Sequence, residues 1–478
     1  MRLLVYGLGR SGSAVVARAV REGQTVAFVE RRGSGPDVEA ALALGAERIA
    51  QVDGAAAWPD TLCVAAPGVP IDHPDLERLR QAGVEVIGEV EWMARTLPAR
   101  IVGVTGTAGK GSVTRWLTDT LAAAGVDAVA GGNIEPALAA VAKAHATWVV
   151  ELSSFQLERC PTLRPDVAVV LNLGVDHLDR HGDVTRYHAA KHNLLANLGP
   201  EQAFVFDAGD PALRRWAAAT PARLLPYTTT SAAADALQAE LGVAPAASIE
   251  ARDDALRLGD TVLLHAGALQ VRGRHQQANA LAVALAAQEL GLPLAAIAAG
   301  LRAFRGLPGR YADVGRLGHV RFIDDSIATR ELAVAAALEA TPAPVVWLAG
   351  GVDKGADPLR LEALVRERVS LMLGLGASGP TLIAAVGAWT RTERVAEPDG
   401  RRAMREAVRR AWDHLQHHHG GRGQVLLAPL AASFDQYRDY ADRGSAFREA
   451  VEALRHDAAD ENQDQTQPDG EATWTRSC

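Results

Sequence analysis

Lysine is rare in this sequence, and the positions of the few lysines are the first indication of chemistry. The 478-residue chain has 49 basic residues, of which only four are lysine. They are Lys110, Lys143, Lys191 and Lys354. Arginine replaces lysine wherever any cation would serve, so a retained lysine is a candidate for a compact point charge or a neutral, reactive amine.

Lys110 lies in a glycine-rich loop between an apolar run and a helical pattern. The loop reads Thr105-Gly106-Thr107-Ala108-Gly109-Lys110-Gly111-Ser112. Backbone N–H groups of such loops surround nucleotide phosphates, and a lysine offsets the charge of the transferring phosphoryl group. The spelling departs from the common G-x-x-x-x-G-K-[ST] pattern, because Gly111 stands at the hydroxyl position. We predict that this loop binds the phosphates of ATP.

A second glycine loop opens the chain. Gly7, Gly9 and Gly12 lie between a strand pattern and a helix pattern, and Glu30 ends the next strand pattern. This arrangement favours a nucleotide or diphosphate at a helix N-terminus. A purely structural tight turn is the alternative.

Three further residues suggest metal chemistry beside the phosphate loop. Glu151 ends an apolar run, where a carboxylate could hold Mg²⁺; the alternative is a helix-capping acid. His177 lies in the polar segment 172–181 and could equally be a surface histidine. Lys191 could add CO₂ and become a carbamate, a ligand that arginine cannot imitate, or could be an exposed helix lysine.

The elements that must position these residues follow an alternating strand and helix pattern, which predicts α/β architecture. A break at Leu97-Pro98 and a glycine-proline segment at 305–309 divide the chain into three regions. Short antiparallel strands are expected within 248–270, which makes the second sheet mixed. The remaining expected strands are 3–6, 25–29, 62–65, 84–87, 101–104, 148–151, 167–172, 204–206, 320–323, 345–349, 381–386 and 424–427.

Composition excludes several classes of function. The net charge of −8 leaves no excess of cations for nucleic acid or an anionic membrane. The three cysteines lack disulfide or zinc spacing, and no apolar run is long enough to span a bilayer. We therefore expect a cytoplasmic protein that binds neither nucleic acid nor membrane, and a monomer. The polar segment 456–478 is expected to be a disordered tail.

The motifs TGTAGKGS, ELSSFQLE, DHLDRH and YHAAK, in this order and spacing, resemble those of the Mur ligase superfamily. ELSSFQLE and PLAASFDQYRDYADRGSAFREAV are most similar to its D-glutamate-adding members, and the resemblance extends to about Arg455. It implies three domains: a Rossmann-like UDP-sugar domain (1–97), a central P-loop-like ATPase domain (98–306) and a Rossmann-like amino-acid domain (307–455).

The resemblance also implies roles for individual residues. For ATP these are loop 105–112 with catalytic Lys110, together with Asn279, Arg310 and Asp325. For two Mg²⁺ ions they are Glu151, His177, carbamylated Lys191 and, in place of the usual hydroxyl, Ser112. For UDP-N-acetylmuramoyl-L-alanine they are Ser11, Glu30, Arg32, Asn133 and Gln156, and for D-glutamate Thr329, Lys354, Ser433 and Tyr440.

The implied activity is ATP-dependent amide formation through an acyl phosphate, in the synthesis of peptidoglycan precursors. Two departures from the family pattern bear on it: Ala108 and Gly111 in the phosphate loop, and Ile327 where a lysine is expected near the D-glutamate carboxylates, with Arg330 nearby. Three alternatives remain open. They are a Mur-type or folyl-polyglutamate-type ligase for another amino acid, an NAD-dependent oxidoreductase, and a nucleotide-binding scaffold without turnover.

Overall fold

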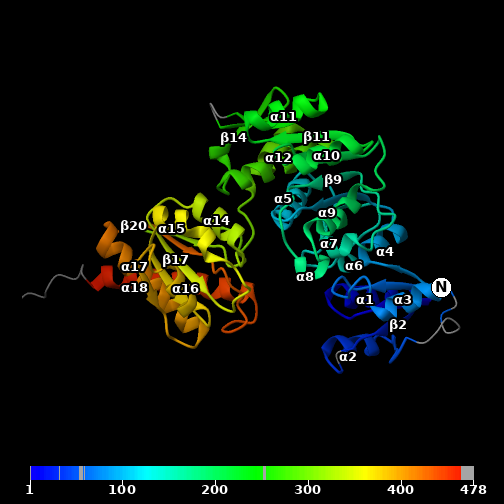
Figure 1. Cartoon of the computed structure of the whole chain (residues 1–478), viewed down its shortest axis with the longest axis horizontal. Coiled ribbons are helices and arrows are strands. Elements are labelled where there is room, and N and C mark those ends of the chain that lie inside the picture. Colours follow the sequence, from blue (N-terminus) through cyan, green and yellow to red (C-terminus); the bar gives the residue numbers. More distant parts are fainter. Residues whose placement is uncertain (1, 32, 53–57, 59, 251–253, 465–478) are drawn as a thin grey trace, which may run out of the picture. The chain divides into compact units, whose positions relative to one another are not determined.

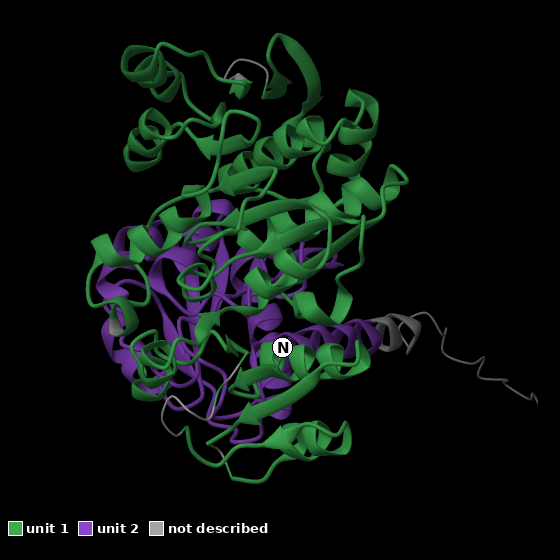
Figure 2. Ribbon diagram, turned by 90° about the vertical axis from the view of Figure 1, so that its right-hand side faces the viewer, with its two compact units in different colours: residues 1–304 green, residues 305–478 purple. Residues whose placement is uncertain are grey.

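The computed structural model describes residues 2–31, 33–52, 58, 60–250 and 254–464. The chain forms two compact units, Met1–Phe304 and Arg305–Cys478, which Figure 2 colours separately. The first unit contains two β-sheets and the second contains one. The α/β class with three sheets and a mixed second sheet is as the sequence predicts, and the third sheet is mixed as well.

The first sheet is parallel and has the strand order β3-β2-β1-β4-β5. Its strands are β1 (Arg2–Tyr6), β2 (Thr25–Val29), β3 (Glu47–Arg48), β4 (Thr61–Ala65) and β5 (Glu85–Ile87). Its helices are α1 (Arg10–Arg21), α2 (Pro36–Ala43), α3 (Pro74–Gln81) and α4 (Glu89–Thr96). Strands β1, β2 and β4 are continuous apolar runs because helices cover a parallel sheet on both faces.

The second sheet has nine strands in the order β14-β13-β12-β11-β10-β9-β6-β8-β7. Figure 1 labels β9, β11 and β14 of this sheet. Strands β6 (Arg100–Thr105), β7 (Ala128–Gly132), β8 (Thr147–Glu151), β9 (Val167–Val170), β10 (Ala203–Asp207) and β11 (Arg223–Thr228) are parallel. Strand β12 (Ala247–Glu250) is parallel to β11, and β13 (Ala255–Leu258) and β14 (Thr261–His265) add antiparallel pairs. Because β6 lies between β8 and β9, the residues that follow these three strands share one edge.

Helices surround the second sheet, and one of them carries the phosphate loop. They are α5 (Lys110–Ala123), α6 (Leu138–Val141), α7 (Ser154–Leu157), α8 (Leu178–His181), α9 (Val184–His192), α10 (Pro211–Ala219), α11 (Ser231–Leu241), α12 (Arg274–Glu289) and α13 (Leu294–Ala303). Helix α5 packs against α12 and α13. The Trp116 ring stacks on Phe304 with centroids 4.5 Å apart, and its Nε1 donates to the Gly300 carbonyl at 3.3 Å. This packing fixes the helix whose N-terminus faces the loop.

The third sheet has the order β15-β16-β20-β17-β18-β19, with only β15 antiparallel to its neighbour. Its strands are β15 (Ala312–Leu317), β16 (His319–Asp324), β17 (Val345–Gly350), β18 (Val369–Leu375), β19 (Thr392–Arg394) and β20 (Arg422–Leu427). Its helices are α14 (Glu331–Ala340), α15 (Glu362–Arg368), α16 (Gly379–Val386), α17 (Gly400–His419) and α18 (Tyr440–Asp464). Among the helices in the described ranges, none is long and apolar enough to cross a membrane.

Two expectations about secondary structure are wrong. Residues 381–386, expected as a strand, belong to helix α16, and the strand of this region is β18. A short apolar run is compatible with either element, and Pro380 suits the first helical turn. The expected disordered tail is helical over 456–464, because no glycine or proline interrupts the helix pattern before Pro468; residues 465–478 lie outside the described part.

The close approach of Gly12 to the first glycine loop gives a stability prediction. A Cβ at Gly12 would lie 1.9 Å from the Gly7 carbonyl oxygen. Gly12→Ala should therefore destabilise the first unit by about 1–3 kcal/mol and lower its transition temperature in differential scanning calorimetry. Gly9→Ala is the matched control, since nothing lies within 4 Å of its Cβ. Equal transition temperatures for the two variants would contradict the close packing.

Candidate functional site

The phosphate loop connects β6 to α5 through a backbone that requires glycine. Gly109 immediately precedes α5 with a φ of +83°, and a Cβ there would lie 2.8 Å from Oδ1 of Asn279. Gly106 has a φ of +152°. Both are conformations that residues with a side chain adopt at a cost. The loop therefore follows a path that only this spacing of glycines permits, and Asn279, a predicted nucleotide residue, lies against it.

Asn172, to which the sequence analysis gave no role, holds the loop from the adjacent strand. Its Oδ1 accepts hydrogen bonds from the backbone N–H groups of Thr107 at 3.1 Å and Ala108 at 2.9 Å. Its Nδ2 donates to the Ala108 carbonyl at 3.2 Å. The available signal was an asparagine two residues after the buried strand β9. Asn172 is thus a positioning residue for the loop.

The two threonines of the loop use their hydroxyl groups within the protein. The Thr105 hydroxyl donates to the Leu152 carbonyl at 2.8 Å, and the Thr107 hydroxyl oxygen accepts from Gly174 N–H at 2.8 Å and lies 3.2 Å from the Tyr187 hydroxyl. Both hydroxyl groups therefore hold the loop against the neighbouring segments. Ser112, on the first turn of α5, is 4% exposed.

Two of the four lysines converge on one carbonyl oxygen. Lys110 Nζ donates to the Gly106 carbonyl at 2.9 Å and to the Thr107 carbonyl at 3.1 Å, and Lys191 Nζ donates to the same Gly106 carbonyl at 2.8 Å. Lys191 is only 1% exposed, and its Nζ lies 4.7 Å from the Tyr187 ring centroid. Burial, with a further contribution from the Lys110 charge, lowers the pKa of Lys191 to about 6. Burial thus favours the neutral amine at Lys191, which is not an exposed helix lysine.

Glu151 lies beside this pair at the end of β8, which is hydrogen-bonded to β6. The carboxylate is 3% exposed, and its Oε1 accepts from Asn133 Nδ2 at 2.7 Å. It does not cap helix α7, because Ser153 does so in a capping box with Gln156. A buried carboxylate with one amide partner has lone pairs free for a hard cation.

His177, the third predicted metal ligand, is more exposed than Glu151 and Lys191. Its backbone is left-handed, with a φ of +51°, and its side chain is 46% exposed. The ring lies 4.8 Å from the Phe155 ring, and Nε2 is 3.6 Å from a carboxylate oxygen of Asp176. Among the described residues, no three His, Cys, Asp or Glu side chains form a metal cage.

A pocket of about 470 Å³ joins the first glycine loop to the second sheet. It brings together four of the five residues predicted to bind the nucleotide sugar, namely Ser11, Glu30, Asn133 and Gln156. Glu30 also accepts the Leu8 N–H at 2.8 Å, which fixes the loop against β2. The fifth predicted residue, Arg32, lies outside the described residues.

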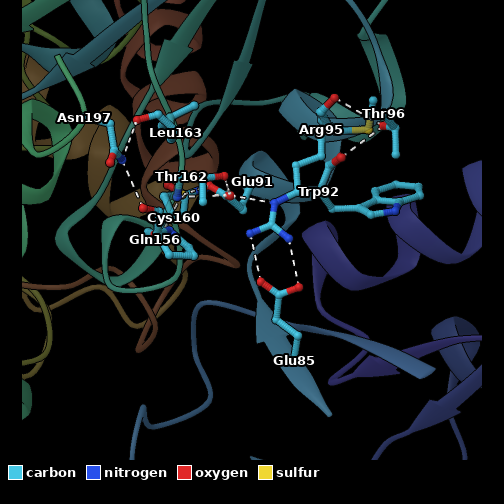
Figure 3. A network of polar contacts seen from close by, with 12 residues as sticks. Glu85, Glu91, Trp92, Arg95, Thr96, Gln156, Cys160, Thr162, Leu163 and Asn197 are labelled. Carbon is cyan, nitrogen blue, oxygen red and sulfur yellow. Dashed lines mark hydrogen bonds and ion pairs between the residues drawn. The ribbon is translucent and has the colours of Figure 1, made fainter. Parts of the chain in front are cut away.

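A polar network joins helix α4 to the segment after α7 (Figure 3). Glu91, which is fully buried, accepts from Arg95 Nε at 2.7 Å and from the N–H and hydroxyl of Thr162. Arg95 also binds Glu85 through two nitrogens. The Cys160 thiol donates to the Gln156 carbonyl at 3.2 Å. The network fixes the segment that carries Gln156 against the first sheet.

The residues predicted to contact nucleotide from the second unit lie at the end of β16. Asp325 is 8% exposed, and its Oδ1 accepts the Tyr311 N–H at 3.1 Å. Burial raises the pKa of Asp325 to about 7, and the charge of Arg310 opposes the shift.

The residues predicted to bind D-glutamate belong to the same unit, on loops and at the start of α18. Arg330 Nη1 donates to the Lys354 carbonyl at 3.1 Å, so two cationic side chains start from adjacent backbone segments. Thr329 directly precedes Arg330; Ser433 is 2% exposed and Tyr440, at the start of α18, is 46% exposed. Arg443 donates to the Ser326 and Ala431 carbonyls at 2.9 and 3.0 Å, which ties the loop after β16 to the loop after β20.

Comparison with known proteins agrees with this geometry. Residues 104–287 match the family model of the Mur ligase middle domain, and residues 1–88 match that of the MurD-like N-terminal domain. A UDP-N-acetylmuramoylalanine–D-glutamate ligase of Thermus thermophilus is 47% identical over 94% of this chain and 97% of its own length. One from Deinococcus radiodurans is 42% identical over 95% of this chain and 92% of its own.

Solved structures share the fold at low sequence identity. The UDP-N-acetylmuramate–alanine ligase MurC of Thermotoga maritima has a TM-score of 0.57 at 18% identity, covering 95% of this chain and all of its own. The MurF ligase of Thermotoga maritima, solved with ADP, has a TM-score of 0.56 at 16% identity, covering 90% and 96%. With sequence relatives matched over nearly their whole length, the chain belongs to the Mur ligase family, within the group of UDP-N-acetylmuramoylalanine–D-glutamate ligases.

Proposed function

We propose that this protein uses ATP to join D-glutamate to UDP-N-acetylmuramoyl-L-alanine. The observation that carries the proposal is the convergence of Lys110 and Lys191 on the Gly106 carbonyl, within a phosphate loop on the same sheet edge as Glu151. The relatives from Thermus thermophilus and Deinococcus radiodurans are named as ligases of these two substrates, which supports the choice of substrates. The proposed place of action is the cytoplasm, in line with the free, buried thiols of Cys63 and Cys160.

In this proposal each of the three sheets belongs to a region that binds a different substrate. Residues 1–97 bind the UDP-sugar together with Asn133 and Gln156, residues 98–306 bind ATP, and residues 307–455 bind D-glutamate. The pocket at Ser11 and Glu30 supports the first assignment, and the loop at 105–112 supports the second. We propose that the protein acts as a monomer.

The proposed reaction has two steps, phosphoryl transfer and amide formation. A carboxylate oxygen of the L-alanyl group attacks the γ-phosphorus of ATP, and ADP leaves with the electrons of the broken P–O bond. The D-glutamate amine then attacks the acyl carbon, phosphate leaves, and the amine loses a proton. In the first step the Lys110 ammonium exchanges its loop carbonyls for phosphate oxygens and offsets the repulsion between the two anions.

Magnesium supplies Lewis-acid polarisation of the phosphate oxygens in such reactions. Glu151 and Ser112 offer oxygen ligands here, and His177 offers an imidazole. An ammonium at position 191 would repel a cation beside Gly106, but a neutral amine can attack CO₂, lose a proton and become a carbamate. We propose that Lys191 carries this carboxylate-like group, and that with Glu151 and His177 it completes two Mg²⁺ sites.

The first experiment measures phosphate release by the purified protein with ATP, Mg²⁺ and UDP-N-acetylmuramoyl-L-alanine, while only the amino acid is varied. We expect turnover with D-glutamate and none with L-alanine or diaminopimelate. Turnover with another amino acid would move the protein to a different branch of Mur-type or folyl-polyglutamate-type ligases. ATP binding without any phosphate release would indicate a scaffold, and binding of nicotinamide dinucleotide would favour an oxidoreductase.

The carbamate assignment predicts the behaviour of Lys191→Arg. Arginine cannot form a carbamate, so kcat should fall roughly 100-fold or more, and bicarbonate should not restore it. Activity of the wild type should rise with pH through about 6, where the Lys191 amine becomes neutral, and should depend on CO₂ in depleted buffer. Lys143→Arg, at a surface lysine paired with Asp127, is the matched control. Near-normal turnover of Lys191→Arg would reject the carbamate.

Position 327 holds isoleucine where the family pattern has a lysine. A second substitution tests whether Arg330 supplies the missing positive charge. Arg330 is held beside Lys354, and loss of one charge-assisted hydrogen bond to a glutamate carboxylate should raise the KM for D-glutamate roughly tenfold in Arg330→Ala. The KM for ATP should stay within twofold of the wild-type value. Arg360→Ala, at a 70% exposed side chain of the same unit, is the control. An unchanged KM for D-glutamate would exclude Arg330 from the site.

A further inference from the structure

Glu89 is a buried carboxylate that no step of the proposed reaction uses. It lies at the start of α4 and is 2% exposed. Its Oε1 accepts the Ala139 N–H at 2.7 Å, and its Oε2 accepts the hydroxyl of Ser11. Glu89 therefore connects the first turn of α1 to the segment that enters α6, directly behind the pocket lined by Ser11, Asn133 and Ala137.

The contact with Ser11 creates a competition for one proton. A serine hydroxyl has a single hydrogen to donate, and an ionised carboxylate or diphosphate can only accept. While Ser11 donates to Glu89, it has no hydrogen for a phosphate oxygen in the pocket. If Glu89 is protonated, its own O–H can donate to Ser11 Oγ, and the Ser11 hydrogen becomes free to turn toward the ligand.

We propose that Glu89 takes up one proton from solvent when a nucleotide diphosphate binds, so that Ser11 changes from a donor to Glu89 into a donor to the diphosphate. The inference rests on the proposed function, because it needs a diphosphate ester in this pocket. No bond to carbon or phosphorus changes, and the only transfer is the proton from solvent to a Glu89 oxygen. Glu89 is thus a positioning residue that acts through Ser11.

The surroundings of Glu89 are suited to this exchange. Burial raises the pKa of Glu89, and hydrogen bonds from Ala139, Ser11 and Leu138 and the charge of Arg10 oppose the shift. Arg10 is 63% exposed and paired with Glu135 at 2.7 Å, so its effect is reduced by solvent. Glu91 and Cys160 lie on the same side; Glu91 binds Arg95, and burial raises the pKa of the Cys160 thiol. Two cations are also near: Arg18 donates to the Ala139 carbonyl at 3.2 Å and pairs with Glu22, and the Arg159 carbonyl accepts the Gly88 N–H at 2.9 Å. An arriving diphosphate adds negative charge and favours protonation further.

The experiment is isothermal titration calorimetry of UDP-N-acetylmuramoyl-L-alanine into the full chain without ATP, in buffers of different ionisation enthalpy at several pH values. The diphosphate of this probe is a diester and does not titrate near neutrality. We expect uptake of close to one proton, and an affinity that weakens by up to tenfold per unit as pH rises above the Glu89 pKa of the free protein. In Glu89→Gln the side-chain amide can donate to Ser11 Oγ as a protonated carboxyl group would. This variant should show neither the proton uptake nor the loss of affinity with rising pH.

Glu135→Gln is the matched control, because it removes a carboxylate from the same edge of the pocket without a contact to Ser11; it should retain the proton uptake. Should Glu89→Gln fail to fold, infrared difference spectra of the wild type provide the second readout, and a carboxylic-acid band should appear on binding. Binding without proton uptake, or equal uptake by Glu89→Gln, would overturn the inference alone. No binding by the wild type would overturn the proposed function and the inference with it.

Discussion

The carbonyl oxygen of Gly106 is the point on which the central site depends. It accepts hydrogen bonds from both Lys110 and Lys191, although two ammonium groups so close together would repel each other. Burial and the Lys110 charge resolve this conflict by favouring the neutral amine at Lys191. The two nitrogens therefore differ in charge although they share one acceptor, and they can take different chemical parts.

The two lysines can share the Gly106 carbonyl only if the backbone of the loop at 105–112 is held in place. Glycine at 106 and 109 permits the backbone path, and Asn172 fixes it with three hydrogen bonds from the neighbouring strand. The order β9-β6-β8 places Asn172 and Glu151 on opposite sides of the loop. Helix α5 is held in turn by Trp116 and Phe304 at its contact with α13. The loop is thus preorganised by groups that belong to four separate elements.

Buried carboxylates join the first two sheets into one unit. Glu91 binds Arg95 and Thr162, and Glu89 binds Ser11 and Ala139, so both side chains of one helix reach across to the second sheet. A buried carboxylate without such partners would cost several kcal/mol. The pocket lined by Ser11, Glu30, Asn133 and Gln156 lies along this junction, which explains why its lining residues are far apart in the sequence. The junction also positions the glycine loop at 7–12 relative to the loop at 105–112.

The sequence by itself predicted the α/β class, the glycine loop at 105–112 and Lys110 and Lys191 as candidate site residues, because strand periodicity, glycine spacing and the scarcity of lysine are local properties. It could not determine whether 381–386 is a strand or a helix, since a short apolar run fits both, nor the end of the last helix. Only the tertiary structure revealed the roles of Asn172, Glu89 and Glu91, whose partners lie 65, 78 and 71 residues away. Contacts of that kind arise from strand order and burial, and burial rather than residue type makes Lys191 a neutral amine.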